Sequence, residues 1–230
     1  MNTESVNVLN TKSVFVIAID GPSGAGKGTL SQLVAKHFGY HLLDSGALYR
    51  LVALSALNQG VDLQDEQAIA DIARQLQVKF DIAGNTTRIV LDGNDVTDAI
   101  RHENVSMSAS LIAAYPMVRS ALLQRQKDFA QAPGLVADGR DMGTTVFPEA
   151  QVKIFLTASA EARAERRFKQ LHEKGVEVNM AELVSDIKAR DDRDTQRATS
   201  PLKPADDALV LDSTSLTIDQ VLSAILAQVR

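Results

Sequence analysis

The run "VFVIAID" at residues 14–20 and the stretch "GPSGAGKGT" directly after it constrain the fold of this chain more than any other segment. The run is apolar and rich in Val and Ile, which predicts a strand buried on both faces, as in a parallel sheet. The glycines and the proline that follow predict a tight turn, and residues 28–38 have a helical pattern. The sequence therefore predicts a strand, a glycine-rich loop and a helix, in that order.

The glycine-rich stretch from Gly21 to Lys27 has the spacing G-x-x-x-x-G-K of a phosphate-binding loop. Glycines let backbone N–H groups turn toward an anion, and the start of the following helix adds its positive end. We expect Lys27 to contact the β and γ phosphates of a nucleoside triphosphate. Gly28 stands where a Ser or Thr is usual, so Thr29 is expected to supply the hydroxyl near magnesium. The predicted nucleotide-binding residues are Gly21, Pro22, Ser23, Gly24, Ala25, Gly26, Lys27, Gly28 and Thr29.

Apolar runs alternate with helical patterns along most of the chain. The predicted strands are 14–20, 40–45, 135–140, 152–158 and 208–214. The predicted helices are 28–38, 117–130, 160–173 and 180–190, with a last helix that opens at Thr217 and Gln220 in capping-box spacing. This alternation predicts an α/β fold of the three-layer P-loop type, with a five-stranded parallel sheet flanked by helices.

One stretch interrupts the alternation. Residues 62–105 become polar and hairpin-like, with Gly84-Asn85 and Gly93-Asn94 as turn signals. We interpret 62–105 as a small inserted subdomain, 14–61 and 106–230 as the core, and 1–13 as a flexible tail. A short lid is expected near residues 158–175.

Charge and composition exclude several classes of protein. The formal net charge of −5 argues against binding a nucleic acid polymer, so any anion must be bound locally. No cysteine is present, which removes disulfides and thiol chemistry and fits a cytoplasmic location. The start has no signal-peptide pattern, and no apolar run approaches the ~20 residues of a membrane helix. No heptad or long apolar surface stripe is visible, so we expect a monomer.

Polar residues follow two of the predicted strands, where α/β sheets bind ligands. Ser45 is a candidate helix cap and, with Arg50, a candidate phosphate ligand. Asp138 ends an apolar strand and suits a water-mediated magnesium role, while Arg140 and Asp141 reach into the crevice.

Charged residues also recur on the predicted helices. Arg190, Asp194 and Arg197 have the spacing of one helical face, which fits either a ligand site or a solvated charged face. Arg163 and Arg167 are four residues apart with acidic neighbours, so surface ion pairs are the stronger interpretation on spacing alone. The phosphate loop makes a lid that clamps a transferring phosphate plausible.

The residues also indicate the kind of acceptor. A GTPase usually carries N-K-x-D, which is absent from this sequence. Transfer to a hydroxyl usually needs a carboxylate base, whereas a phosphate acceptor with a second pKa of ~6 is already an anion at neutral pH. An arginine-rich site therefore favours a nucleoside monophosphate as acceptor.

Five segments in order, "GPSGAGKGT", "LLDSGALYR", "ADGRDMGTTVFP", "VKIFL" and "RDDRD", resemble those of the bacterial cytidylate kinases. The similarity runs from about residue 14 to the C-terminus, and 62–105 resembles the enlarged monophosphate-binding region of the bacterial type. The resemblance implies transfer from ATP to CMP or dCMP, with Mg²⁺ and without a covalent enzyme intermediate.

The resemblance also implies roles for individual residues. Ser110, Arg119 and Asp141 would read cytosine, because a carboxylate accepts from the exocyclic amino group while Arg and Ser donate to the ring nitrogen and carbonyl. Asp194 would hold the sugar hydroxyls. The residues expected at the acceptor phosphate are Ser45, Arg50, Arg140, Arg190 and Arg197. Those expected to act on the transferring group are Lys27, Arg140, Arg163, Arg167 and Arg190, and those expected to hold Mg²⁺ through water are Thr29 and Asp138.

Two other functions stay open at this point. One is a kinase of the same fold for UMP, AMP or a hydroxylated metabolite, although the three base-reading residues argue against AMP. The other is a nucleotide-gated binding protein without transferase activity.

Overall fold

A computed structural model describes residues 14–83, 86–173 and 175–229 of the chain. Its larger sheet is parallel, with five strands in the order β2-β6-β1-β7-β8. The strands are β1 (Val16–Asp20), β2 (His41–Asp44), β6 (Leu135–Gly139), β7 (Val152–Thr157) and β8 (Leu209–Asp212). All five predicted strands are confirmed. The register places Asp44 beside Asp138 and Asp20 beside Gly139, so these strands end together at one edge.

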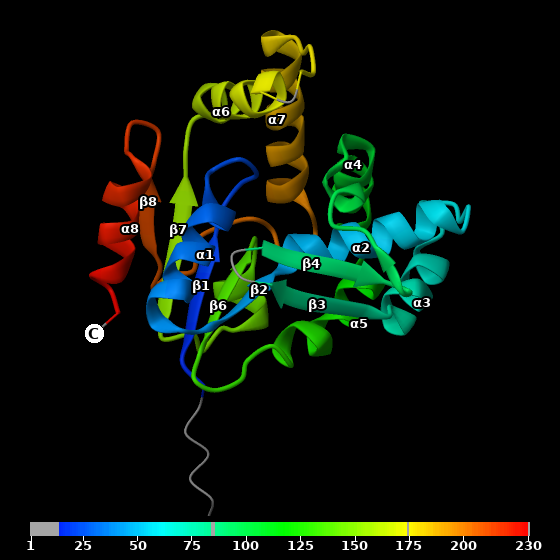
Figure 1. Cartoon of the computed structure of the whole chain (residues 1–230), viewed down its shortest axis with the longest axis horizontal. Coiled ribbons are helices and arrows are strands. Elements are labelled where there is room, and N and C mark those ends of the chain that lie inside the picture. The colour runs from blue at the N-terminus through cyan, green and yellow to red at the C-terminus, as the bar shows by residue number, and fades with distance from the viewer. Residues whose placement is uncertain (1–13, 84–85, 174, 230) are drawn as a thin grey trace, which may run out of the picture.

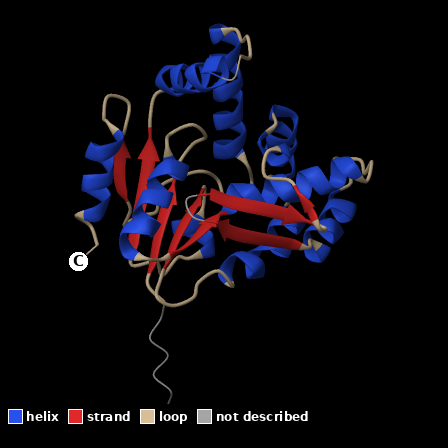
Figure 2. Ribbon diagram, in the orientation of Figure 1, coloured by secondary structure: helices blue, strands red, loops and turns tan. Residues whose placement is uncertain are grey.

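Helices cover both faces of this sheet, which is why its central strands read as unbroken apolar runs. On one face Ile17 and Ile19 pack with helices α1 (Lys27–Phe38) and α8 (Ile218–Leu226). On the other face Val16 and Ala18 pack with α2 (Ser45–Asn58) and α5 (Pro116–Lys127). The three layers are visible in Figure 2. The predicted α/β fold class is confirmed.

Several helix boundaries differ from the predictions, and α1 and α5 each begin one residue earlier than predicted. Helix α2 has Asp44 as its N-cap, whose carboxylate accepts from Ala47 N, so the predicted cap at Ser45 is wrong by one residue. Helix α5 ends at Lys127, three residues earlier than predicted. Helix α7 (Met180–Gln196) continues past Arg190, whereas α6 (Ala160–Glu173) agrees with its prediction. The capping box of Thr217 and Gln220 is present at the start of α8.

The segment between α2 and α5 contains a small antiparallel sheet of three strands, β3 (Val78–Ala83), β4 (Thr86–Leu91) and β5 (Asn94–Asp95). The predicted turn at Gly93 is confirmed, because Gly93 has φ 83° between β4 and β5. The turn predicted at Gly84-Asn85 lies outside the described residues. Helices α3 (Glu66–Gln75) and α4 (Glu103–Ile112) and the 3₁₀ turn 99–101 were not predicted.

The small sheet and its helices share an apolar core with the rest of the molecule. Ile69 of α3 belongs to the same buried cluster as Leu48 of α2 and Leu122 of α5. Figure 1 shows β3 and β4 to one side of the larger sheet, with α6 and α7 standing beyond the end of β7. The division into core, insert and lid stays a prediction. None of the described helices is long and apolar enough to span a membrane.

Candidate active site

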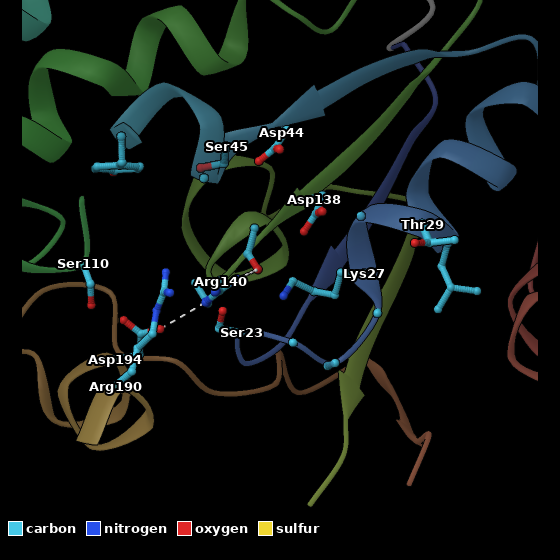
Figure 3. A pocket seen from close by; sticks show the side chains of 18 of the residues that line it. Ser23, Lys27, Thr29, Asp44, Ser45, Ser110, Asp138, Arg140, Arg190 and Asp194 are labelled. Atoms are coloured by element: carbon cyan, nitrogen blue, oxygen red, sulfur yellow. Dashed lines mark hydrogen bonds and ion pairs between the residues drawn. The ribbon is translucent and has the colours of Figure 1, made fainter. Parts of the chain in front are cut away.

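A cavity of about 560 Å³ lies at the carboxyl ends of the parallel strands (Figure 3). It is lined by the phosphate loop, the starts of α1, α2 and α8, parts of α4, α5, α6 and α7, and the segments after β6 and β8. The predicted site residues that line it are Ser23, Gly24, Ala25, Gly26, Lys27, Gly28, Thr29, Ser45, Arg50, Ser110, Arg119, Asp138, Arg140, Asp141, Arg190, Asp194 and Arg197. The predicted residues Gly21, Pro22, Arg163 and Arg167 are not part of its lining.

The phosphate loop keeps its shape largely through its own backbone. Gly21 has φ 147°, and a Cβ at this position would lie 1.9 Å from the carbonyl oxygen of Leu156 in β7. Gly26 caps α1 with φ 96°, a conformation that side-chain-bearing residues rarely adopt. The Nζ atom of Lys27 donates to the carbonyl of Pro22 at 2.8 Å, across the loop. The loop lines the cavity, and the first N–H groups of α1, which have no partner within the helix, are available to an anion bound there.

Three arginines of α6 lie near the phosphate loop, and Arg163 contacts it directly. Arg163 is buried, donates to the carbonyl of Ser23 at 3.0 Å and forms an ion pair with Asp191 of α7. Arg166 donates to the carbonyl of Ser213, after β8, at 2.6 Å. Arg167 pairs with the exposed Glu103 of α4 at 2.9 Å. The predicted phosphate clamp by Arg163 and Arg167 stays a prediction, since both guanidinium groups have protein partners here.

The residues expected to read cytosine meet at the other end of the cavity. Arg119 and Asp141, from α5 and the loop after β6, form a buried ion pair, and Arg119 also donates to the carbonyl of Ala113 at 3.1 Å. Ser110 of α4 is buried and lines the same cavity. These three residues belong to three different segments of the chain, and the fold brings them to one wall of the cavity.

The buried carboxylate of Asp20, at the end of β1, fixes the loop that carries Asp141. Its two oxygens accept from the backbone N–H groups of Met142 and Gly143, each at 2.8 Å. Burial raises the pKa of Asp20 to about 7, although these two hydrogen bonds oppose the shift. This carboxylate directly precedes the phosphate loop, so it ties the two ends of the cavity together.

Four further arginines surround the space between the two ends. Arg140 donates to Asp194 of α7 at 3.1 Å, and Arg50 donates to Asp44 at 3.1 Å. Arg190 and Arg197 belong to the end of α7, and burial lowers the pKa of Arg190 to about 10. Burial also lowers the pKa of Arg197. Arg50, Arg140 and Arg197 can each exchange an intramolecular partner for an anionic ligand, whereas Arg190 Nε is buried without a partner among the described residues.

Ser45 has a buried partner that the sequence did not suggest. Its hydroxyl donates to the side-chain oxygen of Gln126 on α5 at 2.6 Å. Gln126 is only 2% exposed, so this contact fixes the Ser45 side chain at the cavity wall.

Burial also changes the acidity of the two charged groups beside the phosphate loop. It lowers the pKa of Lys27 and raises the pKa of Asp138, because each charged form loses its hydration. Figure 3 shows the two side chains extending toward the same part of the cavity. A bound polyanion restores a favourable environment for the ammonium group of Lys27.

The charge of the cavity is opposite in sign to that of the chain. The described lining includes seven basic side chains, Lys27, Arg50, Arg119, Arg140, Arg166, Arg190 and Arg197, against four carboxylates, Asp44, Asp138, Asp141 and Asp194. The whole chain has a formal charge of −5. The local excess of positive charge favours anionic ligands, as the sequence predicted.

Sequence reasoning missed several lining residues. Asp44 and Tyr49 lie in the stretch that had been singled out, and the spacing of Tyr49 from Ser45 was an available signal for one helical face. Gln170, Ser213, Leu216 and Ile218 reach the cavity through tertiary structure, and no local motif marks them, whereas Thr217 was predicted only as a helix cap.

The phosphate loop lies at one end of an arginine-rich pocket, and a buried ion pair between Arg119 and Asp141 lies at the other end. This arrangement is typical of a P-loop phosphotransferase with a second site for a small anionic acceptor. The family model for cytidylate kinase matches residues 17–230. Cytidylate kinases from Aeromonas hydrophila and Stutzerimonas stutzeri are 59% and 60% identical to this chain, over 92% and 95% of it and 92% and 96% of their own lengths. The chain belongs to the cytidylate kinase family.

A solved structure of a gluconokinase from Sinorhizobium meliloti is 16% identical, with a TM-score of 0.44 over 93% of this chain and 90% of that chain. This similarity is too low to add to the assignment.

Proposed function

We propose that this chain transfers the γ-phosphoryl group of ATP directly to the phosphate of CMP or dCMP, giving ADP and CDP or dCDP. The observation that carries the proposal is the buried wall of Ser110, Arg119 and Asp141 across the cavity from Lys27. A phosphate loop alone supports only triphosphate binding. The wall supplies donors and an acceptor suited to a cytosine edge.

The donor phosphates are proposed to lie against the phosphate loop. Backbone N–H groups from Gly24 to Thr29 and the ammonium of Lys27 would contact the β and γ phosphates. No covalent intermediate is needed, because the acceptor phosphate is itself a nucleophile. The task of the protein is to align the two substrates, neutralise their charge and keep water out.

The acceptor phosphate is proposed to bind Ser45, Arg50, Arg140, Arg190 and Arg197. Arg140 now pairs with Asp194, which is itself the proposed ligand of the sugar hydroxyls. Binding would therefore exchange an intramolecular ion pair for two substrate contacts. We propose that Arg163 and Arg167 act on the transferring group only after α6 and α7 move, since both now pair with carboxylates.

The base is proposed to bind with its amino group toward Asp141 and its ring nitrogen and carbonyl toward Arg119 and Ser110. Uracil presents an oxygen in place of the amino group, so two acceptors would face each other at Asp141. A buried unpaired polar group costs about 1–3 kcal/mol, which favours CMP over UMP.

Thr29 and Asp138 are proposed to hold Mg²⁺ through water. The space beside Asp138 is open, because a Cβ at Gly28 would meet only Asp138 Oδ2, at 3.6 Å. The described residues contain no cluster of three or more His, Cys, Asp or Glu side chains that could hold a metal ion. One carboxylate together with water and substrate phosphates is the usual arrangement for Mg²⁺, so the residues fit the ion. Bound Mg²⁺ would supply charge neutralisation at the β and γ phosphates.

The direct test measures ADP release from Mg-ATP with CMP, dCMP, UMP, AMP and GMP offered separately. Fast release with CMP and dCMP and slow release with the others would support the proposal. Release with UMP as fast as with CMP would remove the proposed role of Asp141. Binding of ATP without release in any mixture would exclude a monophosphate kinase. A monomeric state and a cytoplasmic location stay predictions.

A further inference from the structure

Several buried polar groups of the cavity wall lack a hydrogen-bond partner within the described part of the chain. These are Tyr49 Oη, Arg50 Nε, Ser110 Oγ, Arg190 Nε and Arg197 Nη2. Buried polar groups in folded proteins nearly always have partners, so a cluster of unpaired ones at a cavity points to a ligand that supplies them. Four of these residues already have a proposed role at the acceptor nucleotide. Tyr49 has none.

The position of Tyr49 is well defined by its neighbours. Tyr49 lies on α2, one turn after Ser45, and is 7% exposed. The guanidinium of Arg119 lies over its ring, 5.8 Å from the centroid, and Arg119 in turn pairs with Asp141. The ring is therefore part of the same wall as the proposed base-reading residues.

The hydroxyl of Tyr49 is a neutral hydrogen-bond donor under all ordinary conditions. Burial raises its pKa to about 12, with Asp141 adding to the shift and Arg119 opposing it. The O–H can therefore donate to an oxygen of a ligand without a change of charge.

Within the described residues this hydroxyl has no hydrogen-bond partner. A phenylalanine would keep the ring packing and the contact with Arg119, and it would not leave a polar atom buried without a partner. A group that costs stability in the empty cavity and lines the substrate site is best explained by a contact made with bound substrate.

We propose that Tyr49 contacts the substrate, and that its hydroxyl donates a hydrogen bond to an oxygen of the bound pyrimidine nucleoside monophosphate. The inference rests on the proposed function, because it assigns the ligand of the same acceptor site. It adds a donor to the wall formed by Ser110, Arg119 and Asp141. ATP, on the opposite side of the cavity, is not contacted.

The test compares Tyr49→Phe with Tyr115→Phe as a matched control. The hydroxyl of Tyr115 donates to the carbonyl of Leu63 at 3.0 Å, and Tyr115 is not part of the cavity lining. The same atom is therefore removed in both variants, once from the cavity wall without a partner and once from a hydrogen bond within the protein.

We expect opposite results from the two variants. Tyr49→Phe should raise the KM for CMP about 10-fold, as expected for one lost hydrogen bond to a charged or strongly polar group, with the KM for ATP unchanged. Its Tm without ligand should be equal to or higher than that of the wild type. Tyr115→Phe should keep both KM values and lower the Tm by about 2–4 °C, for a loss of about 1 kcal/mol.

The outcomes separate this inference from the proposed function. An unchanged KM for CMP in a folded Tyr49→Phe protein would overturn the contact, even if the wild type phosphorylates CMP rapidly. Equal rises in the KM values for CMP and ATP would also overturn it, because the effect would then be a general distortion of the cavity. If the wild-type protein phosphorylates neither CMP nor dCMP, the proposed function itself is wrong.

Discussion

The two ends of the cavity are built in different ways. At the proposed donor end, the consecutive residues from Ser23 to Thr29 line the cavity, and their loop is braced by Arg163 and by Lys27 itself. At the acceptor end, side chains from α2, α4, α5, the loop after β6 and α7 meet, and several lack partners. One end has its shape without a ligand, whereas the other is proposed to be completed by one.

This difference has a consequence for specificity. Backbone N–H groups bind any polyphosphate, so the donor end defines a class of ligand. Side chains with unpaired donors and a buried carboxylate distinguish ligands by the groups that those ligands present, so the acceptor end is proposed to select the individual substrate. Mutations at the two ends should accordingly impair different steps, namely phosphoryl transfer at the donor end and selection of the acceptor at the other end.

The largest effect is expected at the donor end. Lys27→Ala removes the ammonium group that spans the phosphate loop and should lower kcat about 1,000-fold or more, because this charge is proposed to act on the transferring phosphate. The loss should be the same for CMP and dCMP. Steady-state kinetics measure the fall in kcat, and a circular dichroism spectrum shows whether the variant is folded. Activity within 10-fold of the wild type would exclude the phosphate-loop assignment.

The next effect is expected at the acceptor end. Asp141→Ala should lower kcat/KM for CMP about 100-fold or more while sparing ATP affinity, since it removes the proposed acceptor of the amino group and leaves Arg119 buried without its partner. Because that loss of a partner destabilises the fold, Asp141→Asn serves as a second variant of the same shape. Its amide can donate, so the ratio of CMP to UMP activity should fall.

A matching loss of ATP binding in either Asp141 variant would show that the two ends are not independent. The contact of Asp20 with the N–H groups of Met142 and Gly143 is the path by which such a coupling would arise. Titration of each variant with ATP alone, followed by fluorescence or calorimetry, distinguishes the two cases.

The same contrast explains what could be predicted from the sequence. The phosphate loop and its strand were predicted because their determinants are adjacent in the chain, as apolar residues and glycines at fixed spacing. The start of α2 shows the limit of local signals, since Asp44 and Ser45 are both good caps and spacing does not choose between them. Helix α7 was predicted too short because its last turns, "DDRDTQ", have no apolar period to extend.

Contacts at the acceptor end are harder to predict because they join distant segments. The partner of Ser45 is Gln126, 81 residues away, and no motif connects the two. Asp20 reaches Met142 across 122 residues in the same way. The resemblance to a family named Ser110, Arg119 and Asp141, but it said nothing of the buried groups that position such residues. Those groups depend on the fold.

The smallest effect is expected for Gln126, and it tests most directly whether the two ends of the cavity are built independently. It lies on α5 and holds the Ser45 hydroxyl at 2.6 Å without lining the cavity. Gln126→Leu keeps the size of the side chain but frees Ser45 to change rotamer, so the KM for CMP should rise about 5-fold, as expected for a loss of about 1 kcal/mol, with little change in the KM for ATP.

Gln124, on the same helix, is the matched control, because its amide donates to Asp128 at the surface. Gln124→Leu should change neither KM nor kcat by more than about 2-fold, as is usual for surface substitutions. If both leucine variants behave alike, Ser45 does not need Gln126 for its position. If Gln126→Leu instead impairs ATP and CMP equally, the acceptor end is not a separately built region, and the contrast between the two ends fails.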